Sequence, residues 1–200
     1  GCRWAGMILS RLQTCGIDLA ESYSYRDEIK ALGDKFLITG ELFPEWGDGF
    51  RRAYDMLERD SWWLDDRFRP VVVHRDFYDK QVLYSPARIT ILDCDGAVMG
   101  DPALDLGNFL AHLRLRALQA PAHAGQLAEA ALFFSKSYKR VEPGIDERAR
   151  WWMAASLIRL ASLYGLRPRW HDLAPRLLDD AINIIGDRKI NIGGLNGIRA

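Results

Sequence analysis

The chain has 200 residues, which is enough for one domain with a sizeable hydrophobic core. Apolar residues make up 48% of it, so a disordered protein is not expected. The 27 basic and 27 acidic residues balance, which argues against a nucleic-acid-binding or anionic-membrane-binding surface. The three cysteines have spacings that fit neither disulfides nor zinc and suit a reducing cytoplasm. No apolar run reaches membrane-spanning length, and no secretory signal pattern opens the chain. We therefore expect a cytoplasmic protein.

Helical periodicity dominates the chain and predicts a mainly α protein. Gly16, Pro44, Gly165 and Gly186 suit helix boundaries, and Asp101 with Pro102 suits a helix start. The expected helices cover residues 3–14, 26–37, 45–64, 102–121, 122–141, 146–164 and 170–185. Large aromatics in these helices, Trp62-Trp63 and Trp151-Trp152, are expected to pack in the interior. Residues 187–200 are rich in Gly and Asn and are expected to form a flexible tail.

The segment 71–106 departs from the helical pattern and carries most of the chemistry. An apolar run, Val71-Val72-Val73, predicts a short buried strand, and residues 82–84 and 89–92 predict a hairpin around Pro86. A reversal at Pro86-Ala87 places Gln81 opposite Leu92 and Lys80 opposite Asp93. Residues 95–100 then read as a loop. The hairpin therefore brings Gln81 and Asp93 together at its open end, with Asp76 on the loop that feeds it.

Two carboxylates and one amide carbonyl at one point favour a bound cation. Two unit charges 5 Å apart repel by roughly 3 kcal/mol at an effective dielectric near 20. Oxygen ligands suit Mg²⁺, which keeps coordination positions open for water and phosphate. The group of Asp76, Gln81 and Asp93 is thus a candidate phosphoryl-transfer site, where catalysis consists mostly of positioning and charge neutralisation.

The segment resembles the aminoglycoside phosphotransferase family, which includes choline-kinase-like enzymes and has a protein-kinase-like fold. That family carries His-x-Asp, a short gap, Asn, a hairpin, an Asp-x-Asp/Glu stretch and a Gly-Asp-Pro-x-x-Asp-Leu turn. The corresponding residues here are His74-Arg75-Asp76, Gln81, Asp93-Cys94-Asp95 and Gly100-Asp101-Pro102-Ala103-Leu104-Asp105-Leu106. Gln81 stands where the family usually has Asn, and both amides offer the same carbonyl ligand.

The resemblance implies a role for each acidic position. Asp76 would be the catalytic base that orients the acceptor hydroxyl, and Asp93 the main Mg²⁺ ligand, assisted by Gln81. Asp105 would brace the backbone of the catalytic loop.

The positions of the other polar residues near this segment suggest further roles. His74 and Asp101 are expected to give structural support rather than to react. Lys80 could neutralise the transferred phosphate or be a solvated loop charge. Asp79 and Asp95 are candidate contacts to the substrate, and Asp95 could instead assist the metal. His112 is expected at the surface or on a helix face.

The resemblance extends only to the C-terminal lobe of a kinase-like fold. Neither a glycine-rich phosphate loop nor a Val-Ala-x-Lys strand is found, and the chain begins with Gly rather than Met. We therefore expect a helical C-terminal lobe over residues 1–186, with an N-terminal ATP-clamping lobe present in the intact protein.

The expected activity is Mg²⁺-assisted transfer of the γ-phosphate of ATP, or another nucleoside triphosphate, to a hydroxyl of a small molecule. The acids near the site favour a cationic acceptor. A catalytically silent nucleotide-binding or regulatory domain is the alternative.

Overall fold

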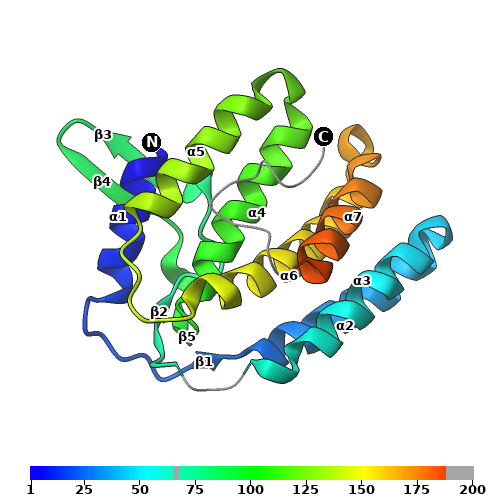
Figure 1. Cartoon of the computed structure of the whole chain (residues 1–200), viewed down its shortest axis with the longest axis horizontal. Coiled ribbons are helices and arrows are strands. Elements are labelled where there is room, and N and C mark those ends of the chain that lie inside the picture. The colour runs from blue at the N-terminus through cyan, green and yellow to red at the C-terminus, as the bar shows by residue number, and fades with distance from the viewer. Residues whose placement is uncertain (65–67, 188–200) are drawn as a thin grey trace.

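The computed structural model describes residues 1–64 and 68–187. They form a mainly helical protein with two small sheets, as the sequence predicts (Figure 1). The helices are α1 (Cys2–Gln13), α2 (Tyr25–Leu42), α3 (Gly47–Asp60), α4 (Ala103–Gln119), α5 (Ala124–Ser137), α6 (Ile145–Gly165) and α7 (Leu173–Gly186). The strands are β1 (Ser22–Tyr23), β2 (Val71–Val73), β3 (Val82–Ser85), β4 (Arg88–Ile91) and β5 (Val98–Gly100).

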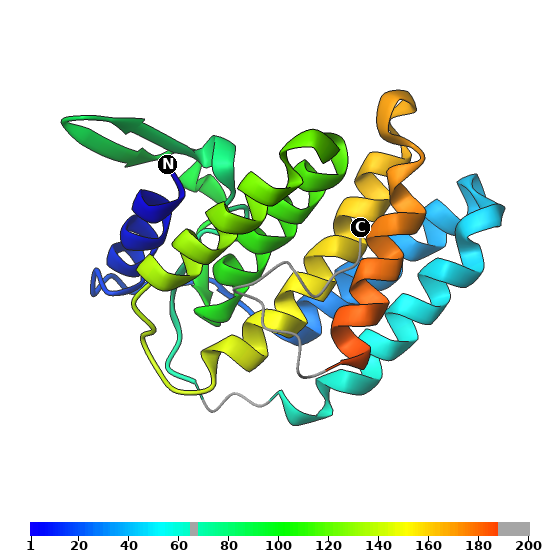
Figure 2. The same cartoon turned by 45° about the horizontal axis from the view of Figure 1, so that its top comes forward.

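Helices α4 and α6 form the centre of the core, and most residues of both are buried. Figure 2 shows α6 running between α4 and α7, with α2 and α3 on the far side of α7 from the β3–β4 hairpin. Gly107 allows α4 and α6 to approach closely, because a Cβ atom there would lie 2.6 Å from both Ala149 O and Met153 N. Trp151 and Trp152 are buried, which confirms their predicted packing role. The close contact fixes α4, whose first turn reaches the candidate site.

The helix boundaries follow local signals, but several differ from the prediction; α5, for example, covers Ala124–Ser137 rather than 122–141. Helix α2 begins with a capping box, in which Ser24 and Asp27 bond each other's backbone N–H groups. It continues past the predicted end to Leu42, and neither Gly33 nor Gly40 interrupts it. Gly33 packs against the ring of Tyr54. Helix α3 is shorter than predicted, because its ends are tight turns at Pro44–Trp46 and Ser61–Trp63.

The β3–β4 hairpin has the predicted register. Val82 pairs with Ile91 and Ser85 with Arg88, and the Leu92 N–H donates to Gln81 O at 2.9 Å. Figure 1 shows the hairpin projecting beside α1. Gln81 and Asp93 therefore lie at the open end of the hairpin, where it joins the body of the protein.

The second sheet was only partly foreseen. Strand β2 has the predicted bounds, but the predicted loop at 95–100 contains a tight turn at Cys94–Gly96 and then β5. Strand β5 pairs antiparallel with β2 and parallel with β1, and no pattern in the sequence predicts β1. Such short strands show no alternation of their own and form because a distant partner completes their hydrogen bonds.

One further expectation was wrong. Trp62 is 78% exposed, since it sits on the turn after α3, while Trp63 packs against the core. His112 lies on a face of α4, as one of the two expectations had it, and is buried there with its ring stacked on Tyr78, the centroids 4.3 Å apart. The predicted flexible tail lies outside the described residues except for Asp187.

Candidate active site

The loop after β2 is shaped by a buried carboxylate. Asp105, in the first turn of α4, accepts hydrogen bonds from the His74 N–H at 2.7 Å and the Arg75 N–H at 2.9 Å. Burial raises the pKa of Asp105 to about 6, while these two hydrogen bonds act to lower it. Arg75 has a left-handed backbone (φ 69°), which a non-glycine residue adopts only when its surroundings hold it there. The loop therefore turns sharply and presents Asp76 to solvent.

The side chain of His74 connects the same loop to Leu92, the residue that follows β4 of the hairpin. It is almost fully buried, and its Nε2 lies 2.7 Å from Leu92 O. Leu92 directly precedes Asp93, which also has a left-handed backbone (φ 58°, ψ 55°). His74 therefore connects the loop that carries Asp76 to the residue that carries Asp93.

Gln81 brings the two carboxylates into one group. Its Nε2 donates to Asp76 Oδ2 and to Asp93 Oδ2, each at 3.4 Å. All three side chains that the sequence predicted to converge are thus in one place, although residues 76 and 93 belong to different loops. A half-turn of the Gln81 amide would present its carbonyl oxygen to the same point.

This group fits a magnesium ion by the chemistry of its donors. Carboxylate and amide oxygens are the ligands that Mg²⁺ prefers, and it commonly takes only one or two carboxylates together with substrate phosphates. Within residues 1–64 and 68–187, no cluster of three or more His, Cys, Asp or Glu could hold a metal. The three donors would suit a hard ion whose remaining positions are taken by phosphate oxygens and water.

A polar chain of residues supports the loop from the helical side, and the sequence did not reveal it. The Asn108 amide donates to Phe77 O at 3.1 Å, and Arg159 donates to Asn108 Oδ1 at 2.7 Å. Arg159 also lies 3.4 Å from Glu28. These residues come from α2, α4 and α6, so no local motif could have marked them.

The opposite side of the loop is covered by an aromatic ring. The Arg75 guanidinium lies over the Tyr23 ring, 4.1 Å from its centroid, and the Tyr23 hydroxyl donates to Glu28 at 2.7 Å. Burial, followed by the nearby Glu28 carboxylate, raises the pKa of Tyr23, which keeps the hydroxyl a donor. Strand β1 therefore contributes to holding the loop.

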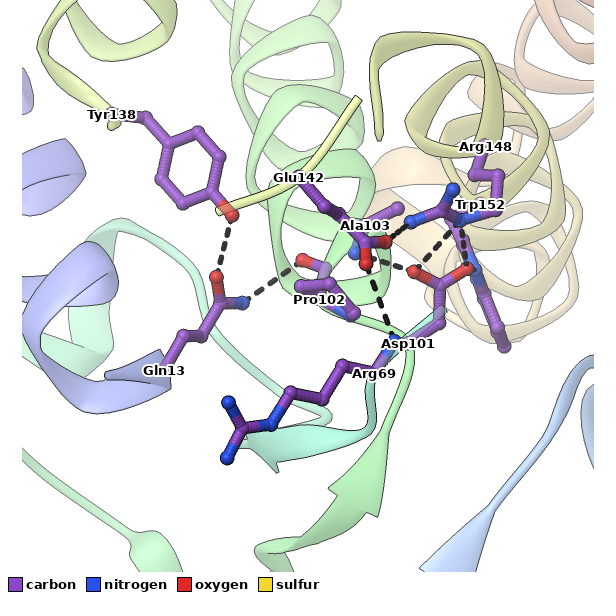
Figure 3. A network of polar contacts seen from close by, with 9 residues as sticks. All are labelled: Gln13, Arg69, Asp101, Pro102, Ala103, Tyr138, Glu142, Arg148 and Trp152. Atoms are coloured by element: carbon purple, nitrogen blue, oxygen red, sulfur yellow. Dashed lines mark hydrogen bonds and ion pairs between the residues drawn. The ribbon is translucent and has the colours of Figure 1, made fainter. Parts of the chain in front are cut away.

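Asp101 anchors the start of α4. It is buried and accepts hydrogen bonds from the Ala103 N–H at 2.9 Å, Arg148 Nε at 3.0 Å and Trp152 Nε1 at 3.0 Å. Figure 3 shows these donors converging on its carboxylate, with Glu142 completing the pairing of Arg148. The start of α4, and with it Asp105, is thus held from α6.

The remaining predicted site residues lie around this group without joining it. Asp79 faces α4, where its carboxylate lies 3.4 Å from Arg116. Lys80 is exposed and lines a cavity beside Asp76. Asp95 is exposed in the turn that follows Asp93, and among the described residues neither it nor Asp79 lines that cavity.

The cavity opens between the loop and three helices. It has a volume of about 570 Å³ and is walled by α2, α4, α6 and the segment after α6, with Asp76 on its surface. Such a volume is typical of small-molecule sites. A hydroxyl compound bound in this cavity would contact a wall that includes Asp76.

The fold resembles that of a solved phosphotransferase. The structure matches the crystal structure of a spectinomycin phosphotransferase in complex with ADP and spectinomycin, with a TM-score of 0.57 and 12% sequence identity. The match covers 94% of this chain and 65% of that protein, so the chain spans about two thirds of its length. No curated protein is significantly similar to the chain in sequence.

The family follows from the sequence itself. Residues 1–151 match the model of the phosphotransferase enzyme family, and the chain belongs to that family. This confirms the resemblance drawn from the motifs in residues 71–106. Among the described residues, no helix is long and apolar enough to cross a membrane.

Proposed function

We propose that the chain forms the acceptor-binding and metal-binding part of a phosphotransferase that moves the γ-phosphate of ATP, or another nucleoside triphosphate, to a small-molecule hydroxyl. The observation that carries the proposal is the bridging of Asp76 and Asp93 by Gln81 at the edge of a ligand-sized cavity. Membership of the phosphotransferase family supports it, as does the presence of ADP in the complex of the structural neighbour.

Asp76 is the catalytic base in this proposal. Its carboxylate accepts a hydrogen bond from the acceptor hydroxyl, aligns the oxygen with the phosphorus, and takes the proton as the new O–P bond forms and the bond to the nucleoside diphosphate breaks. Asp105 and Asn108 hold the backbone on either side of Asp76, so its position is fixed before substrate arrives.

Asp93 and Gln81 would hold Mg²⁺, which supplies neutralisation of the charge on the phosphates. The left-handed backbone of Asp93 aims its carboxylate back toward Gln81 and Asp76. We also propose that an N-terminal lobe of the intact protein completes the nucleotide site.

The test uses Asp76→Asn and Asp93→Asn in the intact protein that carries this chain. Because both side chains are exposed, we expect unchanged circular dichroism and thermal unfolding. We expect turnover to fall by about 10³-fold or more, since loss of a positioned base alone removes 10²–10⁴-fold. Asp48→Asn, an exposed carboxylate on α3, is the matched control and should retain full activity.

Nucleotide binding provides a separate measurement. Mg²⁺-ADP should raise the thermal transition of the intact protein, because a ligand of the folded state stabilises it. Asp93→Asn should reduce that rise, and Asp76→Asn should not. Stabilisation by nucleotide without turnover of any alcohol would replace the proposal with a nucleotide-binding role, and wild-type turnover in either variant would remove the assigned role.

A further inference from the structure

The cavity beside Asp76 is lined by an excess of positive charge. Among the described residues its wall contains five basic side chains and one acidic one, Asp76. The basic residues come from α2, the loop, α4, α6 and the segment that follows α6: Lys35, Lys80, Arg116, Arg159 and Arg167. They converge on one space although they lie far apart in the sequence.

Only two of these cations are neutralised by carboxylates within the described chain. Arg116 lies 3.4 Å from Asp79, and Arg159 lies 3.4 Å from Glu28. Lys35, Lys80 and Arg167 form no ion pair with any residue in the described ranges, and Arg167 lies over the ring of Tyr164, with its guanidinium carbon 4.5 Å from the ring centroid. The three cations without an ion pair outnumber the one carboxylate of the wall, Asp76, so the cavity carries a net positive charge.

Burial, and to a smaller extent these positive charges, lower the pKa of two groups in the cavity wall. Burial, and then the charges of Arg159 and Arg116, lower the pKa of His112 to about 3, so its ring is neutral at ordinary pH. Burial and then Arg159 also lower the pKa of Lys35. Cations held together in a partly desolvated space repel one another, and an anion placed among them removes that repulsion.

We propose that the acceptor carries a carboxylate or phosphate group in addition to its hydroxyl, and that Lys35, Arg159 and Arg167 hold this anionic group. The identity of the acceptor class rests on the proposed function, but the binding of an anion to the cavity does not. Arg159 donates to Asn108 and Ser156 at 2.7 and 3.2 Å and to Glu28 at 3.4 Å, so its guanidinium is held in one position. Because Glu28 already pairs with Arg159, Lys35 and Arg167 supply the unpaired charge for the anionic group, and Arg159 forms the fixed wall beside them.

An anionic acceptor is the opposite of the cationic acceptor that the sequence favoured. The acids near Asp76 in the sequence favoured a cationic acceptor, but Asp79 is turned to Arg116 and Asp95 lies outside the cavity wall. An amine-bearing acceptor would enter a space that already repels positive charge. Lys80, on the same side as Asp76, remains available to the phosphate being transferred.

The experiment measures binding rather than turnover in the intact protein. Four compounds that share a hexose-type scaffold and differ in charge, namely glucose, glucosamine, glucuronate and glucose 6-phosphate, are titrated by calorimetry without nucleotide. We expect one or both anions to bind about ten-fold or more tightly than glucose, and glucosamine to bind no better than glucose. Preference between the two anions separates a carboxylate acceptor from a phosphate one.

Variants connect the preference to the cavity. Lys35 and Arg167 are exposed at its rim, so the double variant Lys35→Gln/Arg167→Gln should fold normally and lose about ten-fold or more in affinity for the anion. Its affinity for glucose should not change. Lys30→Gln removes one exposed charge from the same helix outside the cavity and should leave anion binding as in the wild type.

Three results would overturn the inference. The first is tighter binding of glucosamine than of both anions, and the second is unchanged anion affinity in the double variant. The third is loss of the stabilisation by Mg²⁺-ADP in the double variant while hexose binding is intact, which would mean that Lys35 and Arg167 bind the nucleotide. Anion binding as expected in a protein that phosphorylates no alcohol would support the inference while defeating the proposed function.

Discussion

Replacing Asp105 by asparagine should impair turnover while leaving the global stability almost unchanged. The wild-type carboxylate is fully buried and accepts one hydrogen bond on each oxygen, from the His74 and Arg75 N–H groups. Asparagine has the same shape but keeps only one acceptor, so its NH₂ group faces a backbone N–H. One donor of the loop is then left without a partner in a buried place.

Two opposing contributions decide the size of the effect. The backbone N–H left unpaired beside the asparagine costs about 1–3 kcal/mol. The hydrogen bonds to the charged carboxylate are not added to this cost, because the raised pKa of Asp105 already includes them. Burial, however, raises the pKa of Asp105 from 3.8 to about 6, so the ionised group already destabilises the folded protein. At about 1.4 kcal/mol per pKa unit, that cost is about 3 kcal/mol at pH 7, and asparagine removes it. The two contributions nearly cancel.

The pH dependence gives a sharper signature. A carboxyl whose pKa is raised by folding destabilises the protein fully above its folded pKa, and not at all below its unfolded one. For Asp105 the window runs from about pH 6 down to about pH 4. As the pH falls from 7 to 4, the wild type should gain up to about 3 kcal/mol of unfolding free energy relative to Asp105→Asn.

Three measurements check this reasoning. Urea unfolding at several pH values gives the stability difference, hydrogen exchange gives the protection of the His74 and Arg75 amides, and steady-state kinetics gives turnover. We expect both amides to lose protection and turnover to fall by about 10–100-fold, as small displacements of a catalytic group do. A stability difference independent of pH, or wild-type turnover with normal amide protection, would contradict the assignment of Asp105 as the brace of the loop.

Two further substitutions probe the metal group and the helix contact. Gln81→Leu removes the amide between Asp76 and Asp93, so the Mg²⁺ concentration for half-maximal activity should rise by about ten-fold, measured by a metal titration; an unchanged titration would mean that the residue is not a ligand. Gly107→Ala should lower the unfolding free energy by about 3 kcal/mol in thermal or denaturant unfolding, because its Cβ atom would collide with the backbone of α6. Gly125→Ala, where nothing lies within 4 Å of the added atom, is the matched control and should be neutral or slightly stabilising; equal effects at the two glycines would contradict the close contact.

The sequence by itself determined the features that neighbouring residues control. Strand β2, the register of the β3–β4 hairpin and the meeting of Gln81 with Asp93 followed from an apolar run, a proline turn and the alternation of side chains along strands. The seven helices of the described residues followed from apolar periodicity, with errors mainly at their ends. These features are local, since each depends on residues within about one turn or one hairpin.

Only the tertiary structure decided which distant residues surround that local group. The polar chain from Glu28 through Arg159 and Asn108 crosses three helices, and strand β5 exists because β1 and β2 pair with it. The charge of the cavity likewise depends on which side of each helix faces the loop. Side chains that meet across packed helices share no spacing in the sequence, so their meeting is set by how the helices pack, and a local pattern carries no record of it.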